Sequence, residues 1–267
     1  SVASRGLGDV YKRQDSHACI VDGVRLHVGK RFTFQHNDIG SLEKNIIRAQ
    51  KIVDKTGGGI LVISEGVFGM RGEQGKIKEI VELKKKYDFR LLVDDAHGFG
   101  TLGDDGSGVG KEQNVMDDID VYFATFAKSL ASTGAFVAGS KNVIKFLKYN
   151  MRSQMFAKSL QMQLVVGAIK RLEILKNEPQ HREKLWKNVK ALQTGLVKSG
   201  FDIGTTKSCV TPVFLKGDVP EAMVLVKDLR EKYNIFCSIV VYPVIPKGLI
   251  LLSCLLYTSP SPRDATL

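Results

Sequence analysis

The sequence lacks the features of a membrane-spanning, secreted or zinc-binding protein. No apolar run in its 267 residues approaches the length of a membrane span, and no signal pattern occupies the N-terminus. Cysteine is scarce, with four residues and no CxxC pair. This pattern predicts a reduced, cytoplasmic protein without an integral membrane segment or a metal site.

Internal repeats, low-complexity tracts and the basic stretches typical of nucleic-acid-binding proteins are also missing. The formal net charge is +11, but the lysines are scattered over the expected helices without interleaved aromatic residues. We therefore expect a solvated basic surface and no nucleic-acid partner. Attraction for an anionic substrate is the second interpretation of this charge.

Both ends of the chain look foreign. Residues 4–14 (S-R-G-L-G-D-V-Y-K-R-Q) and 254–264 (C-L-L-Y-T-S-P-S-P-R-D) resemble the two strands of one sequencing adapter after translation. Neither segment has a hydrophobic period, so residues 1–14 and 254–267 are left out of the expected fold. The remaining chain, 15–253, is expected to be a fragment cut at both ends.

The most informative stretch covers residues 119–139 and carries Lys128 at its centre. An apolar strand over Val121–Thr125 ends in a turn that presents Lys128, and a second apolar run follows Gly134. Desolvation at the end of a buried strand lowers the pKa of a lysine ammonium. Such a lysine is the usual amine for a Schiff base with a carbonyl group. The alternative is that Lys128 is one of many lysines in a basic chain.

The surrounding pattern of strands and helices predicts an α/β fold. A buried strand over 60–64, a helix over 77–87 and a strand over 90–93 are joined by short loops. Such units make right-handed crossovers in a parallel sheet, where ligands bind beyond the carboxyl ends of the strands. Two helices broken near Pro179 and an alternating region follow. We expect a partial large domain over 15–177 and a partial small α+β domain over 178–253.

Asp94 and His97 lie where such a sheet binds its ligand. Asp94 ends the strand and His97 follows three residues later, so both can face one ligand. A carboxylate there can keep a pyridine nitrogen protonated while the imidazole contacts the same ring. Glycines 98, 100 and 103 also spell the dinucleotide fingerprint GxGxxG. The sequence predicts no helix after them to bind a pyrophosphate, so an NAD-dependent oxidoreductase is the weaker alternative.

Two other residues have competing interpretations. His17 lies in a short turn before an apolar segment, and a histidine there is more often structural than catalytic. Lys158 stands in a second copy of F-A-K-S-L, the motif that surrounds Lys128. It follows a polar, basic stretch rather than a buried strand. Lys128 is therefore the better candidate for the Schiff base.

Four motifs occur in this order: E-G-V-F-G-M, D-D-A-H-G-F-G-T-L-G, T-F-A-K-S and Y-P-V-I-P-K-G. With these motifs, residues 15–253 resemble the α-oxoamine synthases. These are pyridoxal phosphate enzymes of fold type I, with an aminotransferase-like large domain, a mainly parallel sheet and active sites at a homodimer interface. Within the family the chain looks most like bacterial serine palmitoyltransferases. Glycine C-acetyltransferase and 8-amino-7-oxononanoate synthase are the alternatives.

The resemblance implies a C-acyltransferase with pyridoxal 5'-phosphate as its cofactor. The implied reaction condenses L-serine with palmitoyl-CoA, with loss of CO2 and CoA, to a 3-ketosphinganine-type aminoketone of sphingolipid biosynthesis. Lys128 would hold the cofactor and act as the base at the substrate Cα. Asp94 would pair with the pyridine nitrogen, and His97 would lie by the ring hydroxyl. His17 would stack on the ring, and Thr125 would contact the cofactor phosphate.

Several positions depart from the family pattern. Gly69 replaces the serine of E-G-V-F-S-M, and the Gly-rich phosphate segment before His17 is missing. Ser253 stands where an arginine binds the substrate carboxylate, and the foreign end can have altered its codon. Ser159 falls where a partner subunit usually reaches the phosphate. The fragment itself is predicted to be inactive. A non-catalytic partner subunit is a further alternative, but such subunits typically lack the lysine that Lys128 matches.

Overall fold

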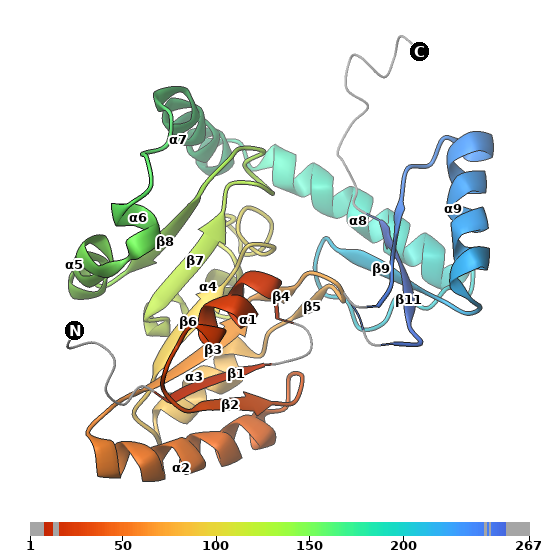
Figure 1. Cartoon of the computed structure of the whole chain (residues 1–267). Helices are drawn as coiled ribbons and strands as arrows, with labels where there is room; N and C mark the ends of the chain where they lie inside the picture. The colour runs from red at the N-terminus through yellow and green to blue at the C-terminus, as the bar shows by residue number, and fades with distance from the viewer. Residues whose placement is uncertain (1–7, 13–15, 243–244, 246, 255–267) are drawn as a thin grey trace. The chain divides into compact units, whose positions relative to one another are not determined.

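The computed structural model describes residues 8–12, 16–242, 245 and 247–254, and the chain divides into two compact units (Figure 1). The first unit contains residues 1–68 and 75–177. The second contains residues 69–74 and 178–267. Among the described residues, none of the helices has both the length and the apolar character needed to cross a membrane.

A six-stranded sheet forms the centre of the first unit, in the order β2-β1-β3-β6-β7-β8 (Figure 1). The first five strands in this order run parallel, and β8 is antiparallel to β7. The prediction of a mainly parallel sheet is confirmed. The strands of this unit, including the separate short strand β4, are β1 (Gly8–Lys12), β2 (Arg31–Phe34), β3 (Ile60–Glu65), β4 (Val67–Phe68), β6 (Arg90–Asp94), β7 (Val121–Thr125) and β8 (Ala135–Gly139).

Strand β1 comes from the segment that the sequence analysis leaves out of the fold. Gly8–Lys12 lies between β2 and β3 and pairs in parallel with both. Parallel pairing uses backbone N–H and C=O groups, so a five-residue segment without a hydrophobic period can still complete the ladder. Excluding all of residues 1–14 from the fold is therefore wrong for the backbone of β1. The foreign origin of the segment stays a prediction.

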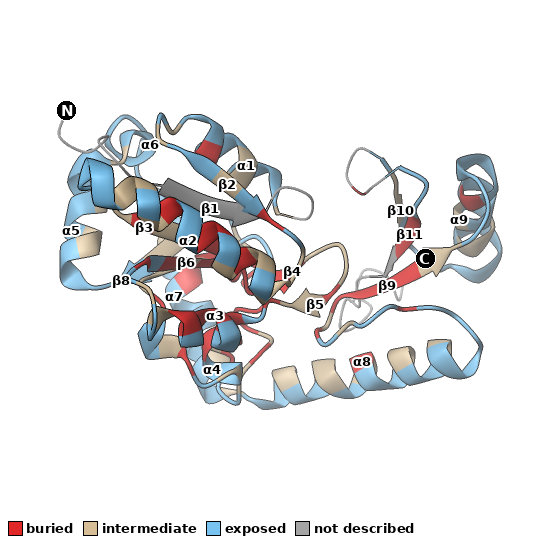
Figure 2. Ribbon diagram, turned by 90° about the horizontal axis from the view of Figure 1, so that it is seen from below, coloured by how far each residue is buried: buried red, intermediate tan, exposed pale blue. Residues whose placement is uncertain are grey.

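Helices cover both faces of this sheet. On one face, Ile20 and Val24 of α1 pack against Leu61, Ile63 and Leu92 of the sheet. On the other, α2 packs against β1, β2 and β3 and buries Leu42, Ile46 and Ala49; Figure 2 shows this buried stripe on the near side of the sheet. The helices of the unit are α1 (Ala18–Arg25), α2 (Ile39–Thr56), α3 (Ile77–Lys84), α4 (Val109–Glu112), the 3-10 turn η1 (Met116–Asp118), α5 (Lys141–Asn150), α6 (Arg152–Met155) and α7 (Met162–Asn177).

The second unit is built on a small antiparallel sheet in the order β10-β11-β9. Its core contains Ile203, Val213, Cys237 and Leu252, with apolar side chains of α8 and α9 packed around them. Asp218 caps α9 and forms a reciprocal capping box with Glu221. The elements of this unit are β5 (Glu73–Gln74), α8 (Gln180–Lys198), β9 (Thr211–Leu215), α9 (Val219–Tyr233), β10 (Ser238–Val240) and β11 (Ile250–Cys254).

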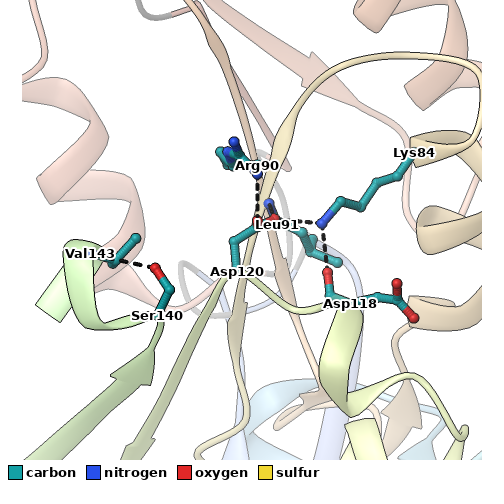
Figure 3. A network of polar contacts seen from close by, with 7 residues as sticks. All are labelled: Lys84, Arg90, Leu91, Asp118, Asp120, Ser140 and Val143. Carbon is teal, nitrogen blue, oxygen red and sulfur yellow. Dashed lines mark hydrogen bonds and ion pairs between the residues drawn. The ribbon is translucent and has the colours of Figure 1, made fainter.

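Asp120 ties together the amino-terminal ends of β6 and β7 and the end of α3 (Figure 3). Its Oδ2 accepts hydrogen bonds from Lys84 Nζ at 2.6 Å and from Leu91 N at 2.7 Å. Its Oδ1 accepts from Arg90 at 3.1 Å, and Lys84 Nζ also donates to Asp118 O. Burial alone would raise the pKa of Asp120, but Lys84, Leu91 and Arg90 together hold it below the usual range.

We expect Asp120→Asn to lower the free energy of unfolding at pH 7 by about 1–3 kcal/mol, because a charge-assisted hydrogen-bond acceptor is lost. The folded pKa of Asp120 lies below its unfolded value of about 3.9. Its contribution is therefore complete above that value and is lost as the pH falls through the folded pKa. Urea unfolding at pH 7 and at about pH 3 should show the difference from wild type shrinking with acid. Exposed Asp117→Asn is the control; an equal loss there would contradict the assignment.

Candidate functional site

The carboxyl ends of three neighbouring parallel strands bring charged side chains together. Glu65 ends β3 and Asp94 ends β6, and the two residues are paired in register. Thr125 ends β7, and Lys128 follows in the next turn. His17 follows β1 and begins α1. This edge of the sheet is where open α/β folds bind their ligands.

Asp94 is a buried carboxylate at the centre of this edge. Its side chain is 6% exposed, and its Oδ1 accepts a hydrogen bond from Ala96 N at 3.1 Å. Burial raises the pKa of Asp94, while the Ala96 N–H and the charges of Lys128 and His17 oppose the rise. Asp94 therefore interacts electrostatically with both basic residues predicted to share its ligand.

Lys128 lies in a closed turn between β7 and β8. Phe126 N donates to Gly134 O at 2.9 Å, Ser132 N to Phe126 O at 2.9 Å and Ala131 N to Lys128 O at 3.0 Å. The residue is exposed, yet partial burial of its ammonium lowers its pKa, against the opposing charges of Asp94, Glu65 and Cys19. The lowered pKa agrees with the direction expected from the sequence.

The two histidines differ in their surroundings. Burial lowers the pKa of His97 to about 4, and the charges of Lys128 and His17 act in the same direction. His97 is therefore neutral at physiological pH. His17 is exposed and caps α1: its Nδ1 accepts from Cys19 N at 3.3 Å, and its backbone N donates to Glu65 Oε1 at 2.5 Å. The capping role is structural, and the imidazole still lies within the electrostatic reach of Asp94.

Of the other predicted residues, Thr125 belongs to the lysine turn, and Lys158 and Ser159 lie in a later segment. Thr125 Oγ1 donates to Gly134 O at 3.1 Å and accepts from Ala127 N at 3.2 Å, so it helps to close the Lys128 turn. Ser159 and Lys158 are exposed in the segment between α6 and α7. The structure brings neither of them into the cluster around Asp94. Leu160 of this segment lies where a side chain on Gly134 would collide with it.

The sequence predicts no role for Glu65, Cys19 or Asp95. Glu65 is 5% exposed and contacts the start of α1. Cys19 Sγ lies 3.0 Å from His17 Nδ1, and burial, Asp94 and Glu65 raise the pKa of its thiol. The sequence marks Glu65 as a carboxylate at the end of a buried strand, but its position beside Asp94 depends on the register of β3 and β6. Cys19 and Asp95 carry no comparable sequence signal.

The GxGxxG glycines have a packing role in this structure. A Cβ on Gly98 would lie 2.1 Å from Asp95 Oδ1, and one on Gly100 would lie 2.5 Å from Ser129 Cβ. Gly103 adopts a φ of 78°, a left-handed conformation that favours glycine. The next helix is the four-residue α4, which begins only at Val109. The geometry does not match a pyrophosphate-binding turn, which needs a helix N-terminus directly after the glycines.

Among the described residues, the structure contains no group of three His, Cys, Asp or Glu side chains that could hold a metal ion.

The fold is a mainly parallel α/β sheet with a lysine after one strand and a buried aspartate at the end of its neighbour. These features define the class of the aminotransferase-like proteins.

Comparison with known proteins identifies the family. The aminotransferase class I and II profile matches residues 10–254, and the chain belongs to this family. A cysteate-C-fatty acyltransferase of Capnocytophaga ochracea is 67% identical over 250 residues, which cover 94% of this chain and 60% of that protein. A serine palmitoyltransferase of Sphingobacterium spiritivorum is 38% identical over 230 residues, 86% of this chain and 56% of that protein. The chain therefore spans about 60% of the length of these relatives.

Solved structures give the same result. A serine palmitoyltransferase of Sphingomonas wittichii superposes with a TM-score of 0.89 at 31% identity, over 99% of this chain and 65% of that one. Related serine palmitoyltransferase structures are described as containing PLP. The predicted family, the α-oxoamine synthases, is confirmed by these relatives. The cysteate enzyme is, however, more similar in sequence than the serine palmitoyltransferase relative cited above.

Proposed function

We propose that the protein containing this chain is a pyridoxal phosphate-dependent C-acyltransferase that joins an amino acid to an acyl thioester with loss of CO2. The observation that carries the proposal is the placement of Lys128 in the turn after β7, beside the buried Asp94 that ends the neighbouring parallel strand β6. The names of the relatives support the reaction class. These relatives are longer than this chain, so the activity is proposed for the complete protein.

The residues at this edge fit pyridoxal phosphate. The cofactor supplies an aldehyde that bonds to amines and a pyridinium ring that stabilises negative charge at a neighbouring carbon. Lys128 offers an amine whose pKa is lowered, so its nucleophilic neutral form is more accessible. Asp94 offers a buried carboxylate for the pyridine nitrogen, and neutral His97 can hydrogen-bond to a ring substituent. His17 and Thr125 are assigned to the ring face and the phosphate by the family resemblance.

The chain's residues then have defined tasks. With the cofactor bound, the amine of the incoming amino acid would displace the Lys128 amine, which would then accept the proton from the substrate Cα. Asp94 would hold the pyridine nitrogen protonated, which would stabilise the electron pair left at Cα. That pair forms a C–C bond to the thioester carbonyl, and the CoA thiolate leaves. The carboxylate departs as CO2, and Lys128 returns a proton to Cα.

We propose L-cysteate as the amino acid and a fatty acyl-CoA as the donor. The 67% identity to the Capnocytophaga enzyme over 250 residues supports this choice. The net charge of +11 agrees with an amino acid that carries a sulfonate as well as a carboxylate. L-Serine and palmitoyl-CoA, the pair expected from the sequence, are the second candidate, supported by relatives at 34–38% identity.

We further propose a homodimer in the cytoplasm. The segment from α5 to α7 exposes several large apolar side chains, and clustered exposed apolar side chains are typical of protein–protein interfaces. Tyr149, Phe156 and Met162 are 62%, 75% and 70% exposed. The same segment carries Ser159, the residue that the resemblance assigns to the partner's cofactor phosphate. A second copy covering this segment would bury these side chains.

One preparation of the full-length protein tests these proposals. Added pyridoxal phosphate should produce an absorbance band near the visible edge, and light scattering should give twice the mass of one chain. With palmitoyl-CoA, we expect kcat/KM for L-cysteate to exceed that for L-serine by about tenfold or more. Glycine and L-alanine, with acetyl- and pimeloyl-CoA, complete the panel of substrates.

Each proposal has its own contradicting result. The cofactor assignment is contradicted if the absorbance band does not appear, and the amino acid assignment if kcat/KM is higher for L-serine than for L-cysteate. The dimer is contradicted if light scattering gives the mass of one chain.

A further inference from the structure

Asp95, the neighbour of Asp94, is fully enclosed and connects several parts of the candidate site. Its side chain is 0% exposed. Its Oδ2 accepts hydrogen bonds from Val109 N at 2.7 Å and from the Tyr122 hydroxyl at 2.8 Å. Its backbone O accepts from Phe99 N at 2.9 Å and from Gly98 N at 3.1 Å. Asp95 therefore binds both the beginning and the end of the loop over residues 95–109, which contains His97.

Three glycines enclose the Asp95 carboxylate. A Cβ added to Gly66 or to Gly98 would lie 2.1 Å from Asp95 Oδ1, and one added to Gly108 would lie 2.0 Å from Oδ2. Each distance is far below van der Waals contact. The carboxylate consequently packs directly against the backbones of three chain segments, and a side chain at any of the three positions would displace it.

These segments carry the residues of the proposed cofactor site. Gly66 directly follows Glu65, and Gly98 directly follows His97. Tyr122 lies on β7, the strand that leads to Lys128. The enclosed loop also reaches the lysine turn itself, because a Cβ on Gly100 would lie 2.5 Å from Ser129 Cβ.

Burying a carboxylate in this position costs free energy, and an apolar side chain in the same space would not have this cost. Asp95 Oδ1 has no partner with hydrogen-bond geometry among the residues that the structure describes. Burial raises the pKa of Asp95 to about 7, and the charge of Asp94 adds to the rise; the Val109 N–H, the Tyr122 hydroxyl and the Gly98 N–H oppose it. Buried, incompletely paired carboxyl groups destabilise a fold, and proteins keep such exceptions mainly at functional sites.

We propose that Asp95 is a positioning residue, whose enclosed carboxylate fixes the loop over 95–109 so that Asp94 and His97 hold their places against the pyridoxal ring. This inference rests on the cofactor assignment proposed above. It requires no contact between Asp95 and the cofactor. The residue acts through Val109 and the three glycine backbones.

The test compares Asp95→Ala with Asp95→Asn in the full-length protein. Alanine removes both acceptors of the side chain, and we expect it to weaken pyridoxal phosphate binding about 10- to 100-fold, as the loss of a supporting hydrogen-bond partner does at metal sites. Asparagine keeps one acceptor oxygen for Val109 N and should weaken binding less than alanine. In the cofactor-free protein, hydrogen exchange of the amides of Val109 and Phe99 should accelerate in Asp95→Ala.

Asp120→Asn is the matched control, because Asp120 is a hydrogen-bonded carboxylate at the opposite ends of β6 and β7. It should lower the unfolding temperature without changing the dissociation constant of the cofactor. Unchanged cofactor binding in Asp95→Ala, with unchanged loop exchange, would overturn the proposal, as would equal effects of Asp95→Ala and Asp120→Asn on binding. If Asp95→Ala does not fold, Asp95→Asn and Tyr122→Phe carry the same comparison. If the wild-type protein does not bind the cofactor, the proposed function is contradicted. Hydrogen exchange of the Val109 and Phe99 amides in Asp95→Ala then tests on its own whether Asp95 fixes the loop.

Discussion

Replacing Lys128 by alanine should abolish the borohydride-reducible bond between the protein and pyridoxal phosphate. The bond joins the Lys128 side-chain nitrogen to the aldehyde carbon of the cofactor, so removing the lysine removes the bond. Lys128 is also the proposed base at the substrate Cα. Loss of the proton transfer alone is expected to slow turnover about 10²- to 10⁴-fold. Reduction must be carried out without added amino acid, because a free amine forms the same type of bond. Mass spectrometry of the reduced protein then shows whether residue 128 carries the cofactor.

Lys158→Ala provides an internal control for Lys128→Ala. Lys158 lies in the same F-A-K-S-L sequence, but the residue is exposed in the segment between α6 and α7. The variant should keep the reducible bond and wild-type turnover. A bond that survives in Lys128→Ala, or one that disappears in Lys158→Ala, would show that the wrong copy of the motif has been chosen.

The regular elements were predictable where one local signal decided them. The apolar run that gives β7 (Val121–Thr125) and the break near Pro179 between α7 and α8 both fall at the predicted places. Helix α3 ends at Lys84 rather than at Tyr87. The N–H groups of Lys85 and Lys86 donate to the carbonyls of residues three positions earlier, while Tyr87 N still donates to Leu83 O, so the helix ends in a mixed turn.

The parts of the site that were missed depend on contacts between distant segments. Glu65 becomes a neighbour of Asp94 only through the register of β3 and β6, which no local pattern encodes. The enclosure of Asp95 needs glycines at 66, 98 and 108 to converge on one carboxylate. In the sequence, Gly98 belongs to the GxGxxG pattern, and nothing there marks Gly66, Gly98 or Gly108 as a neighbour of Asp95. Pairing of distant strands and close backbone approach are properties of the folded chain. They explain why the positions of Asp94 and Lys128 after buried strands could be predicted from local pattern, while the residues packed around them could not.

Asp94→Asn should have the second large effect, because it replaces the charge at the proposed pyridine contact while keeping the size of the side chain. A neutral amide no longer stabilises a protonated ring nitrogen, so the electron pair at the substrate Cα loses its acceptor. We expect kcat to fall about 10²- to 10³-fold, the range for removing one preorganised electrostatic contact. The Lys128 bond to the cofactor should remain, which separates this variant from Lys128→Ala.

A second measurement on Asp94→Asn needs no turnover. The Asp94 charge raises the pKa of Lys128, although burial keeps the net shift downward. Neutralising Asp94 therefore removes a stabilising interaction with the ammonium, and the pKa of Lys128 should fall further. In cofactor-free protein, half-maximal labelling of Lys128 by an amine-reactive reagent should move to lower pH. Asp120→Asn makes the same charge change at the far end of β6 and β7 and should leave the labelling profile in place. A profile that does not move in Asp94→Asn would mean that the two charges do not interact, and the pairing of Lys128 with Asp94 around one ring would lose its physical basis.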